Sequence, residues 1–238
     1  MISKNELKYI QSFAHKKHWE KESVFIVEGP KLVAEAMAAS WPIQKIYAID
    51  TWLKDNNTHG IAIEEIDEIM LERLSHLPTP NQVIALVEKR PNSIHNFEHQ
   101  LTVVLDGLQD PGNVGTIIRT ADWFGIKQII ATEDTVNVYH PKLIQSTMGS
   151  CFRIQMQHMD IAKVLSSTKL PVYGALLEGV SMYDISLQKK GFLIIGNESR
   201  GIREASKKFI TQPICIPKIG AAESLNAAVA AGILLSRF

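Results

Sequence analysis

Residues 110–121 hold the side chains best suited to chemistry, at a point where an apolar run ends and a helix is expected to begin. Asn113 can cap the new helix, Gly115 allows a ligand or backbone to come close, and Arg119 follows within the first helical turns. A helix cap needs no arginine at that place. Because α/β folds build binding sites where a strand passes into the next helix, this junction is a candidate site.

Two later segments combine glycine or small residues with polar side chains in a similar way. Residues 196–198, Gly-Asn-Glu, follow the apolar run 192–195, and residues 224–226, Ser-Leu-Asn, precede an alanine-rich C-terminal stretch. Each motif alone is a weak signal, since such short patterns arise by chance in many chains. Their order and their positions next to expected strands and helices make the combination specific.

The elements that must position these motifs alternate between strands and helices. We expect strands at 101–105, 128–131, 172–175, 192–195 and 214–216, and helices at 114–123, 141–148, 161–165, 202–209 and 224–238. Short apolar strands between helices predict a parallel sheet that is buried on both faces. No Gly-x-Gly-x-x-Gly follows a strand, and no Lys with Ser or Thr follows Gly201, so nicotinamide and P-loop chemistry are disfavoured.

A proline and polar residues at 90–99 predict a linker between this part and a smaller α/β domain. In the smaller domain we expect strands at 24–27, 43–49 and 83–87 and a helix at 30–39. The predicted domains therefore span residues 1–92 and 97–238.

The composition is that of an ordinary globular protein. With 238 residues, of which 45% are hydrophobic, the chain can form one large domain or two small ones. The net charge is zero, so an RNA partner would need a local basic patch. Cys151 and Cys215 show neither a metal-ligand nor a disulfide pattern, and no apolar stretch suits a signal or membrane segment. We expect a reduced, cytoplasmic protein with no metal and no membrane partner.

The motifs together resemble the SpoU/TrmH group of the SPOUT RNA methyltransferases, which transfer a methyl group from S-adenosylmethionine to a ribose 2′-hydroxyl. The matching residues are Asn113, Gly115 and Arg119, then Gly196, Asn197, Glu198 and Gly201, and finally Ile216, Pro217, Ser224, Leu225 and Asn226. The resemblance implies a C-terminal SPOUT domain with a trefoil knot, which base rates alone would oppose. It also implies a homodimer whose sites lie at the interface between the two chains.

The resemblance implies roles for individual residues as well. The S-adenosylmethionine pocket would be lined by Leu176, Gly196, Ile216 and Leu225. Arg119 would either activate the 2′-hydroxyl as a base or grip the adjacent phosphate and steady the developing alkoxide, and both roles are open because guanidinium loses its proton reluctantly. The remaining polar residues, Asn113, Glu198, Ser224 and Asn226, would orient Arg119 and the ribose. Asn113 and Ser224 could instead be plain helix caps, and Asn226 could satisfy a nearby backbone group.

The first part of the chain carries a second resemblance. Residues 25–36 and 79–85 are similar to the opening and closing segments of the ribosomal-protein-L30e-like substrate-binding domain that many of these enzymes carry. Members that methylate tRNA commonly lack this domain, whereas many that act on large-subunit ribosomal RNA have it. The resemblance therefore favours 23S ribosomal RNA as substrate. The alternatives are a tRNA 2′-O-ribose methyltransferase and a non-catalytic RNA-binding or ribosome-assembly factor.

Two basic clusters could hold RNA phosphates. The first contains Lys4, Lys8, Lys16, Lys17 and Lys21 with His15 and His18, and the second contains Arg200, Arg203, Lys207 and Lys208. Both clusters are also compatible with solvated helix faces.

Overall fold

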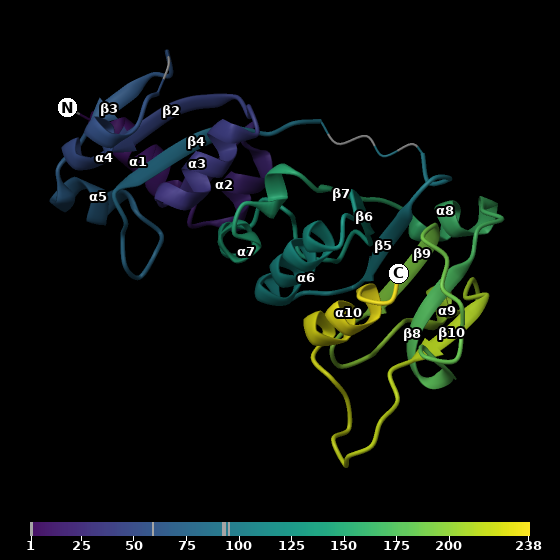
Figure 1. Cartoon of the computed structure of the whole chain (residues 1–238). Coiled ribbons are helices and arrows are strands. Elements are labelled where there is room, and N and C mark those ends of the chain that lie inside the picture. The colour runs from purple at the N-terminus through teal and green to yellow at the C-terminus, as the bar shows by residue number, and fades with distance from the viewer. Residues whose placement is uncertain (1, 59, 92–93, 95) are drawn as a thin grey trace. The chain divides into compact units, whose positions relative to one another are not determined.

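The computed structural model describes residues 2–58, 60–91, 94 and 96–238, and they divide into two compact units (Figure 1). The N-terminal unit comprises the described residues up to Pro91 together with Asn137–Phe152. The C-terminal unit comprises the other described residues up to Val136 and then Arg153–Phe238. Part of the predicted linker, namely residues 92, 93 and 95, lies outside the described residues, so the domain boundaries at 92 and 97 stay a prediction.

The N-terminal unit is built on one mixed sheet with the strand order β1-β4-β2-β3. The strands are β1 (Val24–Glu28), β2 (Ile43–Ala48), β3 (Ile63–Glu65) and β4 (Val83–Glu88). β4 is antiparallel to both β1 and β2, and β2 is parallel to β3. Side chains alternate between the two faces of this sheet: Phe25 and Val27 join one apolar cluster, and Val24 and Ile26 join the other.

Helices cover both faces of this sheet. One cluster includes residues of α1 (Lys4–Ser12), α2 (Lys16–Lys21) and α5 (Glu68–Leu74). The other cluster includes residues of α3 (Pro30–Ala38), α4 (Asp50–Asp55), α7 (Pro141–Thr147) and the short 3-10 helix η1 (Ser150–Phe152). The N-terminal unit therefore has a helix–sheet–helix arrangement in which the sheet supplies the centre of the core.

Aromatic packing explains why α7 and η1 belong to the N-terminal unit, although the sequence places their helix among the elements of the second domain. The ring of Phe25 lies 4.9 Å from that of Tyr139, and the rings of Trp41 and Phe152 lie 5.3 Å apart. Trp41 Nε1 also donates a hydrogen bond of 3.1 Å to the carbonyl of Phe152. Burial of these large rings therefore places residues 137–152 in the N-terminal unit, although their neighbours in sequence belong to the C-terminal unit.

The C-terminal unit contains the predicted parallel sheet, with the strand order β10-β8-β9-β5-β6-β7. Its strands are β5 (Leu101–Asp106), β6 (Gln128–Ala131), β7 (Gln155–His158), β8 (Val172–Ser181), β9 (Gly191–Gly196) and β10 (Gln212–Cys215). Every neighbouring pair is parallel, and β10 changes register against β8 between Pro213 and Ile214. The trefoil knot implied by the family resemblance stays a prediction.

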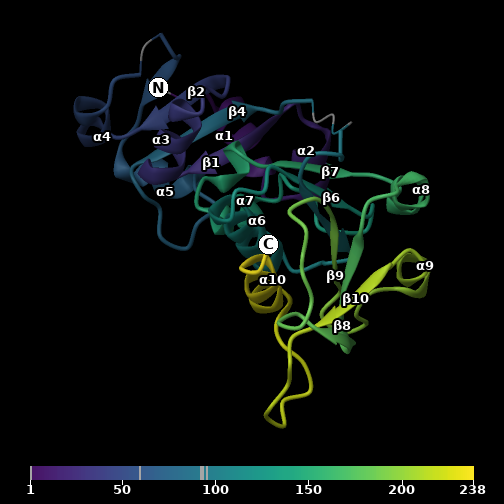
Figure 2. The ribbon, with the colours of Figure 1, turned by 45° about the vertical axis from the view of Figure 1, so that its right-hand side comes forward.

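Helices cover this second sheet as well. α8 (Ile161–Ser167) places Ile161 and Leu165 in a cluster with Val104, Ile130 and Ile194. α6 (Pro111–Trp123) and α10 (Ala227–Leu235) lie side by side in both views, and α10 also contacts β9 (Figures 1 and 2). The close packing of α6 and α10 brings the helices that carry the first and third motifs together.

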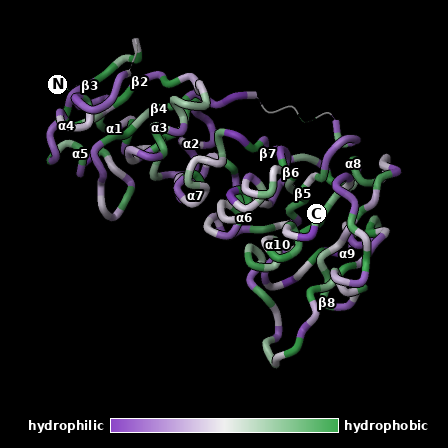
Figure 3. The backbone as a smooth tube through the Cα atoms, viewed as in Figure 1, coloured by the Kyte–Doolittle hydropathy of each residue, from purple (hydrophilic) through white to green (hydrophobic). Residues whose placement is uncertain are grey.

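Two predicted helices are shorter in the structure than the sequence pattern indicates. The helix expected at 202–209 is limited to α9 (Glu204–Lys207), and the one expected at 224–238 begins only at Ala227. A long loop connects β10 to α10 and extends away from the sheet (Figures 1 and 2). Hydrophobic residues colour part of this loop green (Figure 3), and Ile219 within it is fully exposed. In the part of the chain that the structure describes, no helix has the length and apolar character needed to cross a membrane.

Candidate active site

The N-terminal end of α6 positions the first motif. Asp110 is the N-cap, and its Oδ1 accepts a hydrogen bond of 2.8 Å from the backbone N–H of Asn113. Pro111 follows in the first turn, where the missing N–H is harmless. The prediction that Asn113 caps this helix is therefore wrong, because Asp110, three residues earlier, is the cap and accepts the backbone N–H of Asn113. The side chain of Asn113 bonds outside the helix instead.

Hydrogen bonds of the Asn113 side chain bring the motifs together. Its Nδ2 donates to Oε1 of Glu198 at 2.9 Å, and its Oδ1 accepts from Nδ2 of Asn226, also at 2.9 Å. These two partners lie 85 and 113 residues further along the chain. The structure thus joins one polar residue from each motif in a single chain of hydrogen bonds, which we call the amide network.

Asn226 also caps α10. Its Oδ1 accepts from the backbone N–H groups of Ala228 at 2.9 Å and Val229 at 3.2 Å. The alternative that Asn226 satisfies nearby backbone groups is correct, and it coexists with the bond to Asn113. Ser224 is exposed in the preceding loop and is not the cap of this helix. The prediction of Ser224 as a cap is wrong because the helix begins three residues after it.

Arg119 lies exposed on α6, the helix that carries Asn113. Within the described residues, neither a hydrogen bond nor an ion pair holds its guanidinium. Glu198, which could have gripped an arginine, bonds to Asn113 instead. Arg119 therefore presents its charge to solvent and to any ligand that approaches this helix.

The residues predicted to hold the cofactor lie in β8 beyond its pairing with β9, at the carboxyl ends of β9 and β10, and in the loop before α10. β8 and β9 pair up to Gly174 and Ile194, so Leu176 and Gly196 each follow a paired residue by two positions. Ile216 directly follows β10 and is half-buried, whereas Leu225 is 48% exposed. Leu176 is half-buried and packs in part against the core.

Gly196 has a structural reason to be glycine that the sequence did not show. A Cβ atom there would lie 2.2 Å from the backbone carbon of Gly201 and 2.3 Å from the nitrogen of Ile202. The loop after β9 folds back so closely on the strand that a larger residue would displace it. Glycine at this position is therefore required by the loop itself, whether or not a ligand approaches.

A polar pocket of about 320 Å³ lies beside the same loop. Its lining comes from Asp106, Gly107, Gln109, Asp134, Asn197, Glu198, Ser199, Arg200 and Arg203. Arg203 forms an ion pair with Asp106 and another of 3.1 Å with Asp134. In the predicted basic cluster, Arg203 is thus paired with two carboxylates of the protein, and Lys207 pairs with Glu204 at 2.6 Å.

The charges in this pocket shift two pKa values. A hydrogen bond from Thr132, reinforced by the charge of Arg203, lowers the pKa of Asp134. The hydrogen bond to Asp106 raises the pKa of Arg203. Asp106 and Arg203 were not predicted as a pair. The signal available in the sequence was a carboxylate at the end of the otherwise apolar strand Leu101–Asp106.

Comparison with known proteins establishes the family. Residues 100–236 match the model of the SpoU rRNA Methylase family, and residues 4–85 match the model of the MRM3-like substrate binding domain. The chain therefore belongs to the SpoU rRNA methylase family.

Individual relatives agree along nearly the whole chain. The 23S rRNA (guanosine(2553)-2′-O)-methyltransferase RlmP of Bacillus subtilis is 31% identical over 92% of this chain and 90% of its own length. A TrmH-family protein from Porphyromonas gingivalis superimposes with a TM-score of 0.92 at 36% identity, covering 100% of this chain and 98% of the other. An AdoMet-bound rRNA methyltransferase from Sinorhizobium meliloti does so with a TM-score of 0.86 at 30% identity, covering 100% and 95%.

These comparisons confirm several predictions from the sequence. The SpoU/TrmH family, the α/β fold class with an N-terminal domain before a parallel-sheet domain, and the RNA methyltransferase class are confirmed. S-adenosylmethionine as the cofactor is confirmed as well. The roles of individual site residues are not tested by these similarities and are taken up below as proposals.

The two functions of Asn226 can be separated by substitution. Asn226→Asp keeps an oxygen that accepts the N–H groups of Ala228 and Val229, but it cannot donate to Asn113. Asn226→Ala loses both functions. We expect Asn226→Ala to lower the free energy of unfolding by about 1 kcal/mol, and Asn226→Asp to lower it by less than about half that amount. Urea denaturation of the two variants beside the wild type measures this, and equal losses would contradict a capping role.

Proposed function

We propose that this protein is an S-adenosylmethionine-dependent methyltransferase that modifies a ribose 2′-hydroxyl of large-subunit ribosomal RNA. The amide network carries the proposal, because it fixes Asn113, Glu198 and Asn226 around the N-terminal ends of α6 and α10, with Arg119 exposed on α6. The choice of ribosomal RNA is supported by the relative from B. subtilis, which is named for 23S rRNA, and by the substrate-binding domain model that matches residues 4–85.

In the proposed reaction, the ribose 2′-oxygen forms a bond to the methyl carbon, the bond from that carbon to sulfur breaks with its electron pair kept by sulfur, and the hydroxyl proton is released to the solution. When bound, S-adenosylmethionine supplies a methyl group made electrophilic by the sulfonium. The protein must orient the hydroxyl, stabilise the charge that develops on its oxygen and exclude water. Arg119, Asn113, Glu198, Ser224 and Asn226 are the residues that we assign to these tasks.

We assign Arg119 an electrostatic role in this reaction. A guanidinium keeps its proton in proteins, so it donates hydrogen bonds and cannot readily take a proton from the ribose. A positive group that contacts the neighbouring phosphate and the developing alkoxide lowers the barrier without a proton transfer of its own. The exposure of Arg119 and the absence of a bonded partner among the described residues leave its donors available to RNA.

The other polar residues would set the geometry. Because Asn113 donates to Glu198 and accepts from Asn226, its amide orientation is fixed before RNA arrives. Asn226 is in turn fixed by its role as the cap of α10. Ser224, exposed in the loop before this helix, would contribute a hydroxyl to the sugar. Such preorganised amides and hydroxyls suit recognition of sugar oxygens.

Leu176, Gly196, Ile216 and Leu225 would hold the adenine part of the cofactor. The apolar side chains among them are half-buried or exposed, in β8, directly after β10 and in the long loop, so they offer apolar surface beside accessible main-chain groups. This combination fits a purine ring, which needs apolar walls and hydrogen bonds at its edge.

Exposed apolar residues on α6 and α10 support the proposal of a homodimer. Trp123 is 84% exposed at the end of α6, Phe124 directly after it is 42% exposed, and Val229 on α10 is 51% exposed. Because α6 and α10 pack together, these residues are candidates for a self-complementary surface on a second copy of the chain.

The dimer can be tested by adding charge to this surface. We expect Trp123→Glu to shift the protein from dimer to monomer in sedimentation equilibrium, because a carboxylate in an apolar interface is costly to desolvate. Ile69→Glu is the matched control, since Ile69 is 70% exposed on α5 of the N-terminal unit. A wild type that sediments as a monomer would refute the dimer.

The catalytic assignment predicts the effect of removing the guanidinium. Arg119→Ala should lower methyl transfer by about a hundredfold or more, because charge stabilisation in the transition state is lost. The affinity for S-adenosylmethionine should stay within about threefold of wild type. Transfer of tritiated methyl groups to total RNA from a strain lacking the gene, followed by nucleotide mapping, measures the first quantity, and calorimetry measures the second.

Arg237→Ala serves as the control for Arg119, because Arg237 is another exposed arginine of the same unit. A large loss of cofactor affinity in Arg119→Ala would contradict the assigned role. Label in tRNA instead of 23S rRNA would favour the tRNA alternative. Cofactor binding without transfer to any RNA would favour the non-catalytic RNA-binding factor.

The cofactor assignment predicts a different pattern for the long loop. Leu225→Arg should weaken binding of S-adenosylmethionine by about tenfold or more, because a charged side chain replaces apolar surface against the adenine. Ile219→Arg makes the same change at a fully exposed position of the same loop and should leave binding within about twofold. Calorimetry compares the two variants, and equal affinities would remove Leu225 from the pocket.

A further inference from the structure

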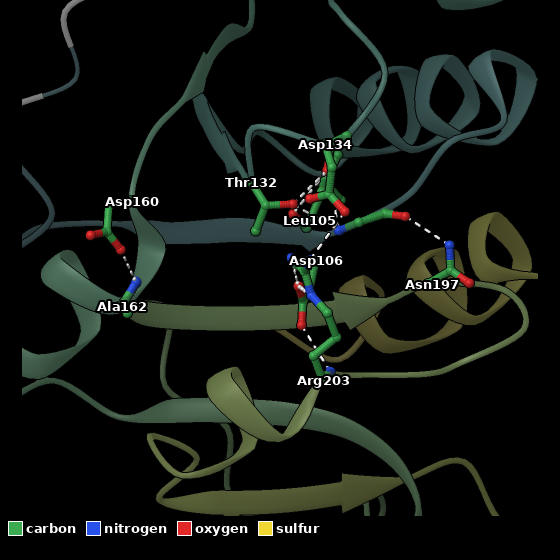
Figure 4. A network of polar contacts seen from close by, with 10 residues as sticks. Leu105, Asp106, Thr132, Asp134, Asp160, Ala162, Asn197 and Arg203 are labelled. Atoms are coloured by element: carbon green, nitrogen blue, oxygen red, sulfur yellow. Dashed lines mark hydrogen bonds and ion pairs between the residues drawn. The ribbon is translucent and has the colours of Figure 1, made fainter.

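Asp106 is a buried charge at the centre of the parallel sheet. It is the last residue of β5, which lies between β9 and β6, and its side chain is 0% exposed. Its Oδ2 accepts from the backbone N–H of Arg203 at 2.9 Å, and its Oδ1 accepts from Nε of Arg203 at 2.6 Å (Figure 4). Nη2 of the same guanidinium also pairs with Oδ1. A carboxylate buried this deeply requires such compensation.

A second attachment lies at the beginning of the loop that leads to Arg203. Nδ2 of Asn197 donates to the carbonyl of Gly107 at 2.7 Å, and Oδ1 of Asn197 accepts from the N–H groups of Ser199 and Arg200. Asn197 and Gly201 also exchange backbone hydrogen bonds of 3.0 and 2.9 Å. The loop 197–203 is therefore fastened at both ends to the carboxyl end of β5 and the residue that follows it.

The attachment point on Gly107 is itself hydrogen-bonded to the segment that follows β6. Gly107 has φ of 75°, and its N–H lies 2.9 Å from Oγ1 of Thr132 and 3.2 Å from Oγ1 of Thr135. Arg203 also connects the loop 197–203 to the segment after β6, because its Nη1 pairs with Asp134 at 3.1 Å. The ends of β5 and β6 and the loop after β9 thus form one polar framework (Figure 4).

Glu198 lies between the two attachments and is exposed, yet it accepts the hydrogen bond from Asn113 at 2.9 Å. The position of its carboxylate is therefore set by the loop rather than by burial of its own side chain. A shift of the loop by about 1 Å is enough to break a hydrogen bond of this length and to disturb a catalytic geometry.

We propose that Arg203 and Asp106 are positioning residues, which hold the loop 197–203 so that Glu198 keeps Asn113 oriented. The proposal rests on the function proposed above for the amide network. Arg203 therefore acts at a distance through Glu198 and does not contact RNA or the cofactor. A merely structural ion pair would instead support folding without any specific connection to Glu198.

The test is a double-mutant cycle on kcat. Arg203→Gln should lower kcat by about tenfold or more, with KM for S-adenosylmethionine within about threefold of wild type, and Arg203→Lys should recover part of the loss. In the Glu198→Ala background, Arg203→Gln should add less than about threefold, because the acceptor of the Asn113 hydrogen bond, through which Arg203 acts, is already removed. Full additivity of the two losses would overturn the proposal.

Arg153→Gln is the matched control variant. Arg153 Nε pairs with Oδ2 of Asp122 at 2.8 Å in the same unit, and its side chain is 40% exposed against 39% for Arg203. Removal of this ion pair should leave kcat within about twofold in both backgrounds. The isosteric Asp106→Asn, which weakens the same attachment from the other side, should reproduce the kcat loss of Arg203→Gln and its dependence on Glu198.

Hydrogen exchange provides a readout that needs no RNA substrate. In Arg203→Gln, a peptide covering residues 197–203 should exchange its amides about tenfold faster than in the wild type, whereas Arg153→Gln should leave that peptide unchanged. Unchanged exchange in Arg203→Gln would overturn the positioning role. If the wild type transferred no methyl group to ribosomal RNA, the proposed function would fail, and the exchange result would still decide whether Arg203 holds the loop.

Discussion

Two hydrogen bonds of the Asn113 side chain hold the three sequence motifs together in the C-terminal unit. One amide donates to Glu198 and accepts from Asn226, so segments separated by 85 and 113 residues must arrive in one place with the correct donor and acceptor. A parallel sheet makes this possible because the carboxyl ends of its strands meet at one edge. The loop after β9 and the start of α6 meet at this edge, and α10 completes the arrangement by packing on α6.

In Asn226 and Gly196, a structural role coincides with a role that we propose for the site. Asn226 caps α10 through its oxygen and reaches Asn113 through its nitrogen, so one side chain stabilises a helix and extends the amide network. Gly196 is demanded by the close return of its own loop. Such double use means that a helix cap or a tight turn is no argument against function. A substitution such as Asn226→Asp, which keeps the capping oxygen but removes the donor to Asn113, is therefore needed to tell the two roles apart.

The parts of the fold that follow apolar periodicity could be predicted from the sequence. The strands β5, β6 and β9 are short apolar runs, and they lie where the pattern indicates. β7 was not predicted because its sequence, Gln-Met-Gln-His, lacks such a run. This strand lies at the edge of the sheet, where it pairs with β6. The assignment of α7 to the N-terminal unit depends on aromatic packing, which periodicity does not encode. At α6 the cap is Asp110 and not the predicted Asn113, because Oδ1 of Asp110 accepts the backbone N–H of Asn113.

The site divides into a rigid part and an exposed part, and this division has a physical cause. Asp106, Asn197 and Arg203 are cross-linked by short polar contacts, so the loop that carries Glu198 is held without a ligand. Arg119 and Leu225 are exposed, and nothing comparable holds them among the described residues. Charged and apolar groups left at a surface gain most when RNA phosphate or an adenine ring covers them. In the proposed function, the cross-linked loop would hold Glu198 in position, and the exposed residues Arg119 and Leu225 would contribute binding energy when a ligand covers them.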